Sequence, residues 1–187
     1  MCGSPGIQVW SWAELRSRAS RRVIEARVRN GDLRRVRRGV YAAATACGRV
    51  IEAAEHGGAL ACETAARHLG IWVLDDEVLH VWMHADRHHH RDASRGCSCI
   101  RHWDAGDAPS TFAVASVPRI LLQIYRCRGE EAFFVALESA RRQGMISRQG
   151  LRRLSESIDG RGRDLIGFSR ADADSGLESL VRLRLRR

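Results

Sequence analysis

The N-terminal fold is decided by one stretch, SWAELRSRASRRVIEARVRNGDLRRVRRGVYA, which covers residues 11–42. Ser11 followed by Glu14 has the form of a capping box, in which each side chain accepts a hydrogen bond from the other residue's backbone amide. Ser20 offers a second N-cap, so the stretch predicts a short helix that runs to Arg18 and a second helix over residues 21–29. Asn-Gly at 30–31 then ends the second helix.

A β-hairpin is predicted after the second helix. The segment 33–41 supplies apolar residues on both sides of Arg37-Arg38-Gly39, which suits a hairpin tip. The order helix, tight turn, helix and β-ribbon is that of a helix-turn-helix with a wing. Helical spacing places Ile24 and Val28, with Val23 beside them, on the inner face of the second helix.

Positive charge is concentrated in this same stretch. The net charge is +9, and every one of the 31 basic residues is arginine. Between Glu14 and Gly39 there are ten arginines and three acidic residues. A GC-rich coding sequence accounts for arginine in place of lysine, but it does not account for the clustering. A basic N-terminal face on a nearly neutral body indicates a polyanionic partner.

The clustered arginines therefore predict an interface with double-stranded DNA. The alternative is a charged surface that contacts only solvent. In a helix-turn-helix the second helix enters the major groove, where an arginine fork can bridge O6 and N7 of guanine. Arginines of the wing would contact phosphates or the minor groove. Glu25 would either repel phosphate or pair with Arg21 or Arg29. The predicted DNA-binding residues are Arg21, Arg22, Glu25, Arg29, Arg34, Arg35, Arg37 and Arg38.

The rest of the chain predicts a mixed α/β region, so the fold class is α+β. We expect a winged helix-turn-helix over residues 1–45, an α/β middle domain with a small sheet and a helical C-terminal part over 46–168, and a final helical segment over 169–187. The composition predicts strands at 77–83, 98–103 and 112–114. It predicts helices at 49–56, 59–69, 117–127, 130–143, 147–157 and 176–187, with a looser glycine-containing stretch before the last.

One histidine-rich segment contains zinc-ligand residue types. Its members are His84, Asp86, His88, His89, His90, Cys97, Cys99 and His102. It has no second cysteine pair and no helical His-x-x-x-His, and arginines alternate with the candidate ligands, so we expect no metal site. The sequence also lacks Gly-x-Ser-x-Gly and a phosphate-binding glycine loop, so we expect no catalytic residue, no cofactor and no enzyme activity.

The chain has no apolar run long enough to span a bilayer and no signal-peptide pattern, so we expect a cytoplasmic protein that does not enter the membrane. Its six cysteines are scattered. In a reducing compartment they are expected to be thiols and not a disulfide framework.

Three segments resemble AbiEi-type antitoxins of type IV toxin–antitoxin systems. Residues 12–42 resemble their N-terminal winged helix, residues 56–70 resemble the helix and loop that follow, and Ser116-Val117-Pro118-Arg119-Ile120-Leu121-Leu122 resembles their next core helix. The resemblance covers about residues 10–170. It implies a DNA-binding antitoxin that represses its own operon, with double-stranded DNA, a cognate toxin operon and a second copy of the chain in a homodimer as partners.

A second resemblance supports an alternative function. Ser175-Gly176-Leu177-Glu178-Ser179 is similar to the first helix of very-short-patch-repair-like endonucleases, in which the glutamate helps to hold magnesium. The later acidic residues of that site have no counterpart before Arg187, and one carboxylate cannot assemble it. The alternatives are therefore a truncated, inactive member of that nuclease family, or an interaction module whose basic face binds an acidic protein.

Overall fold

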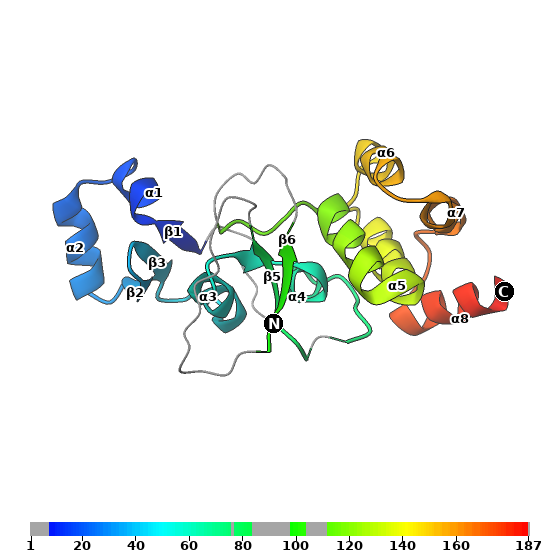
Figure 1. Ribbon diagram of the computed structural model, residues 1–187, viewed down its shortest axis with the longest axis horizontal. Helices are drawn as coiled ribbons and strands as arrows, with labels where there is room; N and C mark the ends of the chain where they lie inside the picture. Colours follow the sequence, from blue (N-terminus) through cyan, green and yellow to red (C-terminus); the bar gives the residue numbers. More distant parts are fainter. Residues whose placement is uncertain (1–7, 76, 84–97, 104–111, 187) are drawn as a thin grey trace. The chain divides into compact units, whose positions relative to one another are not determined.

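The segment after residue 8 forms two helices and a three-stranded sheet. The computed structural model describes residues 8–75, 77–83, 98–103 and 112–186. The first elements are β1 (Val9–Ser11), α1 (Trp12–Arg16), α2 (Arg21–Arg29), β2 (Leu33–Arg37) and β3 (Val40–Ala43). The strands are antiparallel in the order β1-β3-β2, and they lie beside α1 and α2 in Figure 1. The order helix, turn, helix and hairpin is the one that the sequence predicts.

Local signals set the boundaries of the two helices. The capping box at α1 is formed as predicted, because the amide of Ser11 donates to Glu14 Oε2 at 2.6 Å and the amide of Glu14 donates to Ser11 Oγ at 3.2 Å. Ser20 caps α2 by accepting from the amide of Val23. Beyond α2, Gly31 takes a φ of 80°, a left-handed conformation that glycine adopts without steric cost.

A small core holds these elements together. Leu15, Ile24 and Leu33 are buried there, and the partly buried Trp10, Trp12, Ala19, Val28 and Tyr41 pack against them. The expectation that Val23 lies on the inner face of α2 is wrong, since its side chain is exposed. One helix of nine residues turns only a narrow face toward so small a sheet.

The chain continues into a second small sheet. After α3 (Gly48–Glu55) come β4 (Ala59–Leu60), β5 (His80–Met83) and β6 (Ile100–Trp103), in the order β4-β5-β6. β4 and β5 are antiparallel, whereas β5 and β6 are parallel. By its contacts the chain divides into two compact units, residues 1–60 with 78–114 and residues 61–77 with 115–187, which is a different division from the three predicted domains.

The second unit is helical. It contains α4 (Cys62–His68), α5 (Val117–Arg142), α6 (Arg148–Glu156), α7 (Gly160–Phe168) and α8 (Gly176–Arg186). α5 contacts each of the other four helices. It contains a break at Gly129, with φ 81° and ψ −169°, so the two helices predicted at 117–127 and 130–143 are present but joined end to end. With two small sheets beside these helices, the fold class is α+β, as predicted.

Four predicted details are wrong. Residues 59–60 form a strand instead of the start of a helix, residues 112–114 form no strand, and the glycine-containing stretch before the last helix forms α7. Cys47 is disulfide-bonded, so the expectation of thiols fails at this residue, whereas Cys62, Cys99 and Cys127 are thiols.

Candidate nucleic-acid interface

The four α2 residues predicted to contact DNA lie on its solvent side. Arg21, Arg22, Glu25 and Arg29 are all exposed, while Ile24 is buried. At about 100° per residue these four side chains fall within roughly 100° of helix circumference. An α-helix with its side chains is about 10–12 Å across, so a major groove about 12 Å wide can accept it.

Glu25 pairs with Arg21, which decides between the alternatives left open by the sequence. The Nε of Arg21 donates to Glu25 Oε1 at 2.7 Å, one helical turn away. This hydrogen bond is the main cause that lowers the pKa of the Glu25 carboxyl. The positive charge of Arg21 is therefore partly compensated within the helix.

The hairpin presents a second set of arginines. Arg34, Arg35 and Arg38 are exposed, and the strands shift register between Arg35 and Arg37. The turn that carries Arg38 is anchored on α1, because the amide of Trp12 donates to the carbonyl of Gly39 at 2.7 Å. The exposed arginines are thus held on a hairpin that is braced against α1.

Arg37 differs from its neighbours. It is partly buried, and its Nε donates to the carbonyl of Ala54 at 3.0 Å, which ties β2 to the end of α3. This contact occupies Nε of Arg37, a donor that a phosphate would otherwise use. Arg37 therefore mainly holds the hairpin in place, and it is less suited than its neighbours to bind a ligand.

Three arginines on this surface have no partner within the part of the chain that the structure describes. Neither a hydrogen bond nor an ion pair engages Arg22, Arg34 or Arg38 there. Arginine whose forked donors are unsatisfied within the fold is suited to bind phosphate or guanine. The chemistry available at this surface is recognition of a polyanion.

Glu178, the residue similar to a nuclease ligand, makes hydrogen bonds at the start of its own helix. It is exposed, and its carboxylate accepts from the amide of Asp174 at 2.8 Å while its amide donates to Ser175 Oγ at 3.2 Å. These contacts form a capping arrangement at the start of α8. Among the described residues, no group of metal-ligand type that could hold an ion includes it.

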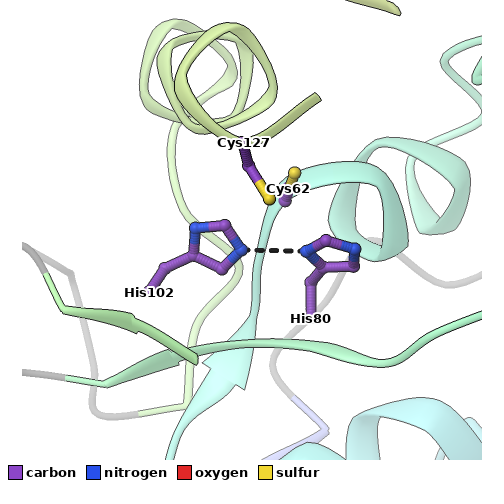
Figure 2. A group of neighbouring side chains, drawn as sticks. All are labelled: Cys62, His80, His102 and Cys127. Atoms are coloured by element: carbon purple, nitrogen blue, oxygen red, sulfur yellow. Dashed lines mark hydrogen bonds between the residues drawn. The ribbon is translucent and has the colours of Figure 1, made fainter. Parts of the chain in front are cut away.

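The sequence analysis named His102 as a metal-ligand type but missed its neighbour His80 and the pair Cys62 and Cys127. In the first unit His80 and His102 face each other, with Nδ1 and Nε2 2.9 Å apart (Figure 2). In the second unit the thiols of Cys62 and Cys127 are neighbours, and burial together with Cys127 raises the pKa of the Cys62 thiol. The histidine-rich segment considered earlier lies outside the described residues from His84 to Cys97. The two members of each pair are far apart in the sequence, so no local motif identifies them.

No protein-family model matches this chain, and no curated protein matches it either. Within the described residues, none of the helices is both long enough and apolar enough to cross a membrane.

Proposed function

We propose that this chain is a DNA-binding transcription regulator that reads its own upstream DNA through an N-terminal winged helix, in the manner of an AbiEi-type antitoxin. The observation that supports it is the pattern of arginines on one unit. Arg22 on α2 and the hairpin arginines Arg34 and Arg38 are exposed and unpaired among the described residues, while Arg37 braces the hairpin from within.

Each part of the surface has its own task in this proposal. The exposed face of α2 meets base edges in the major groove, and the hairpin contacts the phosphate backbone beside it. Phosphate contacts supply affinity and position, and the contacts of Arg22 supply sequence preference. Glu25 limits how strongly Arg21 attracts phosphate, so non-specific binding is moderated at the helix itself.

The test is a binding titration by fluorescence anisotropy. The purified full chain is titrated into its own upstream duplex and into a scrambled duplex of equal length, each at several salt concentrations. We expect preference for the upstream duplex and a log–log salt slope on the order of −5, which corresponds to several phosphate contacts. Arg22→Ala should reduce the preference, and Arg34→Ala should weaken both duplexes alike.

A matched control separates these effects from loss of charge alone. Arg152 is an exposed arginine of α6 in the other unit, and Arg152→Ala removes the same charge from a helix. It should leave both affinities unchanged. Equal, weak binding of the two duplexes by the wild-type chain would overturn the proposal and favour a basic surface for an acidic protein. Magnesium-dependent cleavage of either duplex would favour the nuclease family.

A further inference from the structure

Two thiols of the second unit are neighbours where α4 packs on α5. Cys62 is the first residue of α4, and Cys127 lies on α5, two residues before its break at Gly129. Both are thiols, their sulfur atoms are within 4.8 Å of each other, and Figure 2 draws the two side chains. A disulfide has an S–S distance of about 2.05 Å, so the two sulfurs have to approach each other by less than about 3 Å.

The two thiols differ in their access to solvent. Cys127 is exposed, whereas Cys62 is completely buried. Burial is the main cause that raises the pKa of the Cys62 thiol, and the neighbouring Cys127 raises it further. A buried thiol that keeps its proton is protected from an oxidant in solution, because the thiolate is the reactive form. An oxidant therefore reaches Cys127 first.

The buried thiol is held in a fixed position. The amide of Cys62 donates to Oε1 of Gln123, which lies one helical turn before Cys127, at 3.0 Å. Cys62 has a φ of +48° and is the only non-glycine residue with a positive φ in the described part of the chain. This left-handed conformation is sterically unfavourable for a residue with a side chain, so it persists only where the surroundings enforce it. The Cys62 thiol is therefore placed beside Cys127 before any bond forms.

The exposed thiol is free to turn while the two helices stay together. The next residue of each helix is also paired, because Arg128 Nε on α5 lies 2.7 Å from Glu63 Oε2 on α4. Gly129, with φ 81° and ψ −169°, interrupts α5 directly afterwards, so the helix around Cys127 is not continuous. The exposed side chain of Cys127 can thus rotate toward Cys62 without a shift of either helix.

We propose that Cys62 and Cys127 form a reversible disulfide when a peroxide reaches the chain. The thiolate of Cys127 attacks one oxygen of hydrogen peroxide, the O–O bond breaks, and Cys127 becomes a sulfenic acid. The hydroxide released takes up the proton of the Cys127 thiol and leaves as water. The sulfur of Cys62 then attacks the sulfur of Cys127, the S–O bond breaks, and the second hydroxide leaves as water with the proton of Cys62. Two thiols are oxidised, and one peroxide is reduced to two waters.

The disulfide fixes the chain where the second unit begins. That unit starts at Ala61, and Cys62 is the next residue. The bond closes a loop of about 65 residues, which restricts the unfolded chain and stabilises the folded unit. In a reducing compartment such a bond is transient and responds to oxidation. Both thiols belong to the second unit, so this redox site does not depend on the proposed DNA-binding surface of the first.

The test is oxidation of the full chain by hydrogen peroxide, with a chelator present to remove trace metals. Peptide mapping by mass spectrometry should find a bond between Cys62 and Cys127 that dithiothreitol reverses. Dimedone, which traps sulfenic acids, should label Cys127 about tenfold more in Cys62→Ser than in the wild type, because the second thiol is missing. After the same treatment, the wild type should have a higher urea denaturation midpoint than Cys127→Ser, which cannot form the bond.

Cys99→Ser is the matched control, because Cys99 is a thiol of the first unit that lies outside the pair. It should form the bond between Cys62 and Cys127 as readily as the wild type. If Cys62→Ser fails to fold, peptide mapping of the wild-type chain alone decides. The proposal is overturned if peroxide leaves the two thiols unlinked in the wild type, if either of them is joined to another cysteine instead, or if dimedone labels Cys62 in preference to Cys127.

Discussion

Arg21 and Glu25 form an exposed ion pair along α2, with Nε of the guanidinium 2.7 Å from Oε1 of the carboxylate. Their side chains are 75% and 45% exposed, so the pair adds little to the stability of the fold. Its effect falls on the proposed interface instead, because a fixed negative charge sits among arginines that would face DNA.

Removing that negative charge should strengthen binding to any duplex. In Glu25→Gln, Arg21 loses its partner and one repulsive charge disappears, so we expect affinity for scrambled DNA to rise about 3- to 10-fold and the salt slope to steepen by about one. Anisotropy titrations at several salt concentrations measure both. Glu156→Gln makes the same charge change on the exposed surface of α6 and should alter neither. Unchanged affinity in Glu25→Gln would show that α2 does not face DNA.

Arg37 and Arg38 should behave differently although they are adjacent. Arg37→Ala removes the hydrogen bond to the carbonyl of Ala54, so we expect a loss of about 1–2 kcal/mol in stability and a lower Tm. Arg38→Ala removes only an exposed charge and should leave Tm unchanged while weakening DNA binding about 3- to 10-fold. Thermal unfolding and anisotropy on both variants distinguish the two. The reverse pattern would contradict this division of roles.

The capping box at α1 gives a third prediction. Ser11→Ala removes the acceptor for the amide of Glu14 and should cost about 1 kcal/mol in the free energy of unfolding. Glu14→Gln keeps an oxygen that can accept from the amide of Ser11, so it should cost less. Urea denaturation of both variants measures the difference. Equal losses would contradict the expectation that a glutamine oxygen can replace the carboxylate as acceptor for the amide of Ser11.

Elements with local signals could be predicted from the sequence, and elements set by distant partners could not. The ends of α2 follow from Ser20 and from Asn30-Gly31, all within a few residues of the helix. β4 is different, because two residues become a strand only by pairing with β5, some twenty residues later. α7 was missed because its glycines suggest a loop, whereas Asp159 caps it by accepting from the amide of Gly162 and Leu165 is buried.

The same reasoning applies to the site residues. Helical spacing placed the charged residues of α2 on one face, although it misplaced Val23. The partner of Arg37 on α3 could not be predicted, since it lies 17 residues away in the sequence. Cys62 and Cys127 meet only because α4 packs on α5. No short spacing marks them, so a search for local metal motifs passes over them.

His68 should make stability depend on pH. Burial lowers the pKa of His68, and its Nδ1 is buried without a hydrogen-bond partner among the described residues. The unfolded chain therefore binds a proton more readily than the folded one, so stability is full above a pH of about 6.5 and falls as pH drops toward the lowered pKa. We expect His68→Gln to reduce the decrease in denaturation midpoint between pH 7.5 and pH 5.5. An identical decrease in wild type and variant would exclude His68 as its source.

The last prediction concerns Glu138, a fully buried carboxylate on α5. Arg182 of α8 donates to its Oε1 at 2.8 Å, the amide of Arg170 donates to the same oxygen at 2.7 Å, and Oε2 has no hydrogen-bond partner among the described residues. Arg182→Ala leaves this charge buried without its cation, so it should cost about 3 kcal/mol. Arg184→Ala is the matched control on the same helix, since Arg184 pairs with Glu131 from an exposed position and its loss should cost clearly less stability.

Adding Glu138→Gln to Arg182→Ala should recover part of the loss, because the neutral amide needs no cation. Urea denaturation of the two single variants and the double variant measures this coupling. If Arg182→Ala and Arg184→Ala cost the same, the ion pair between Arg182 and Glu138 does not hold α8 on α5.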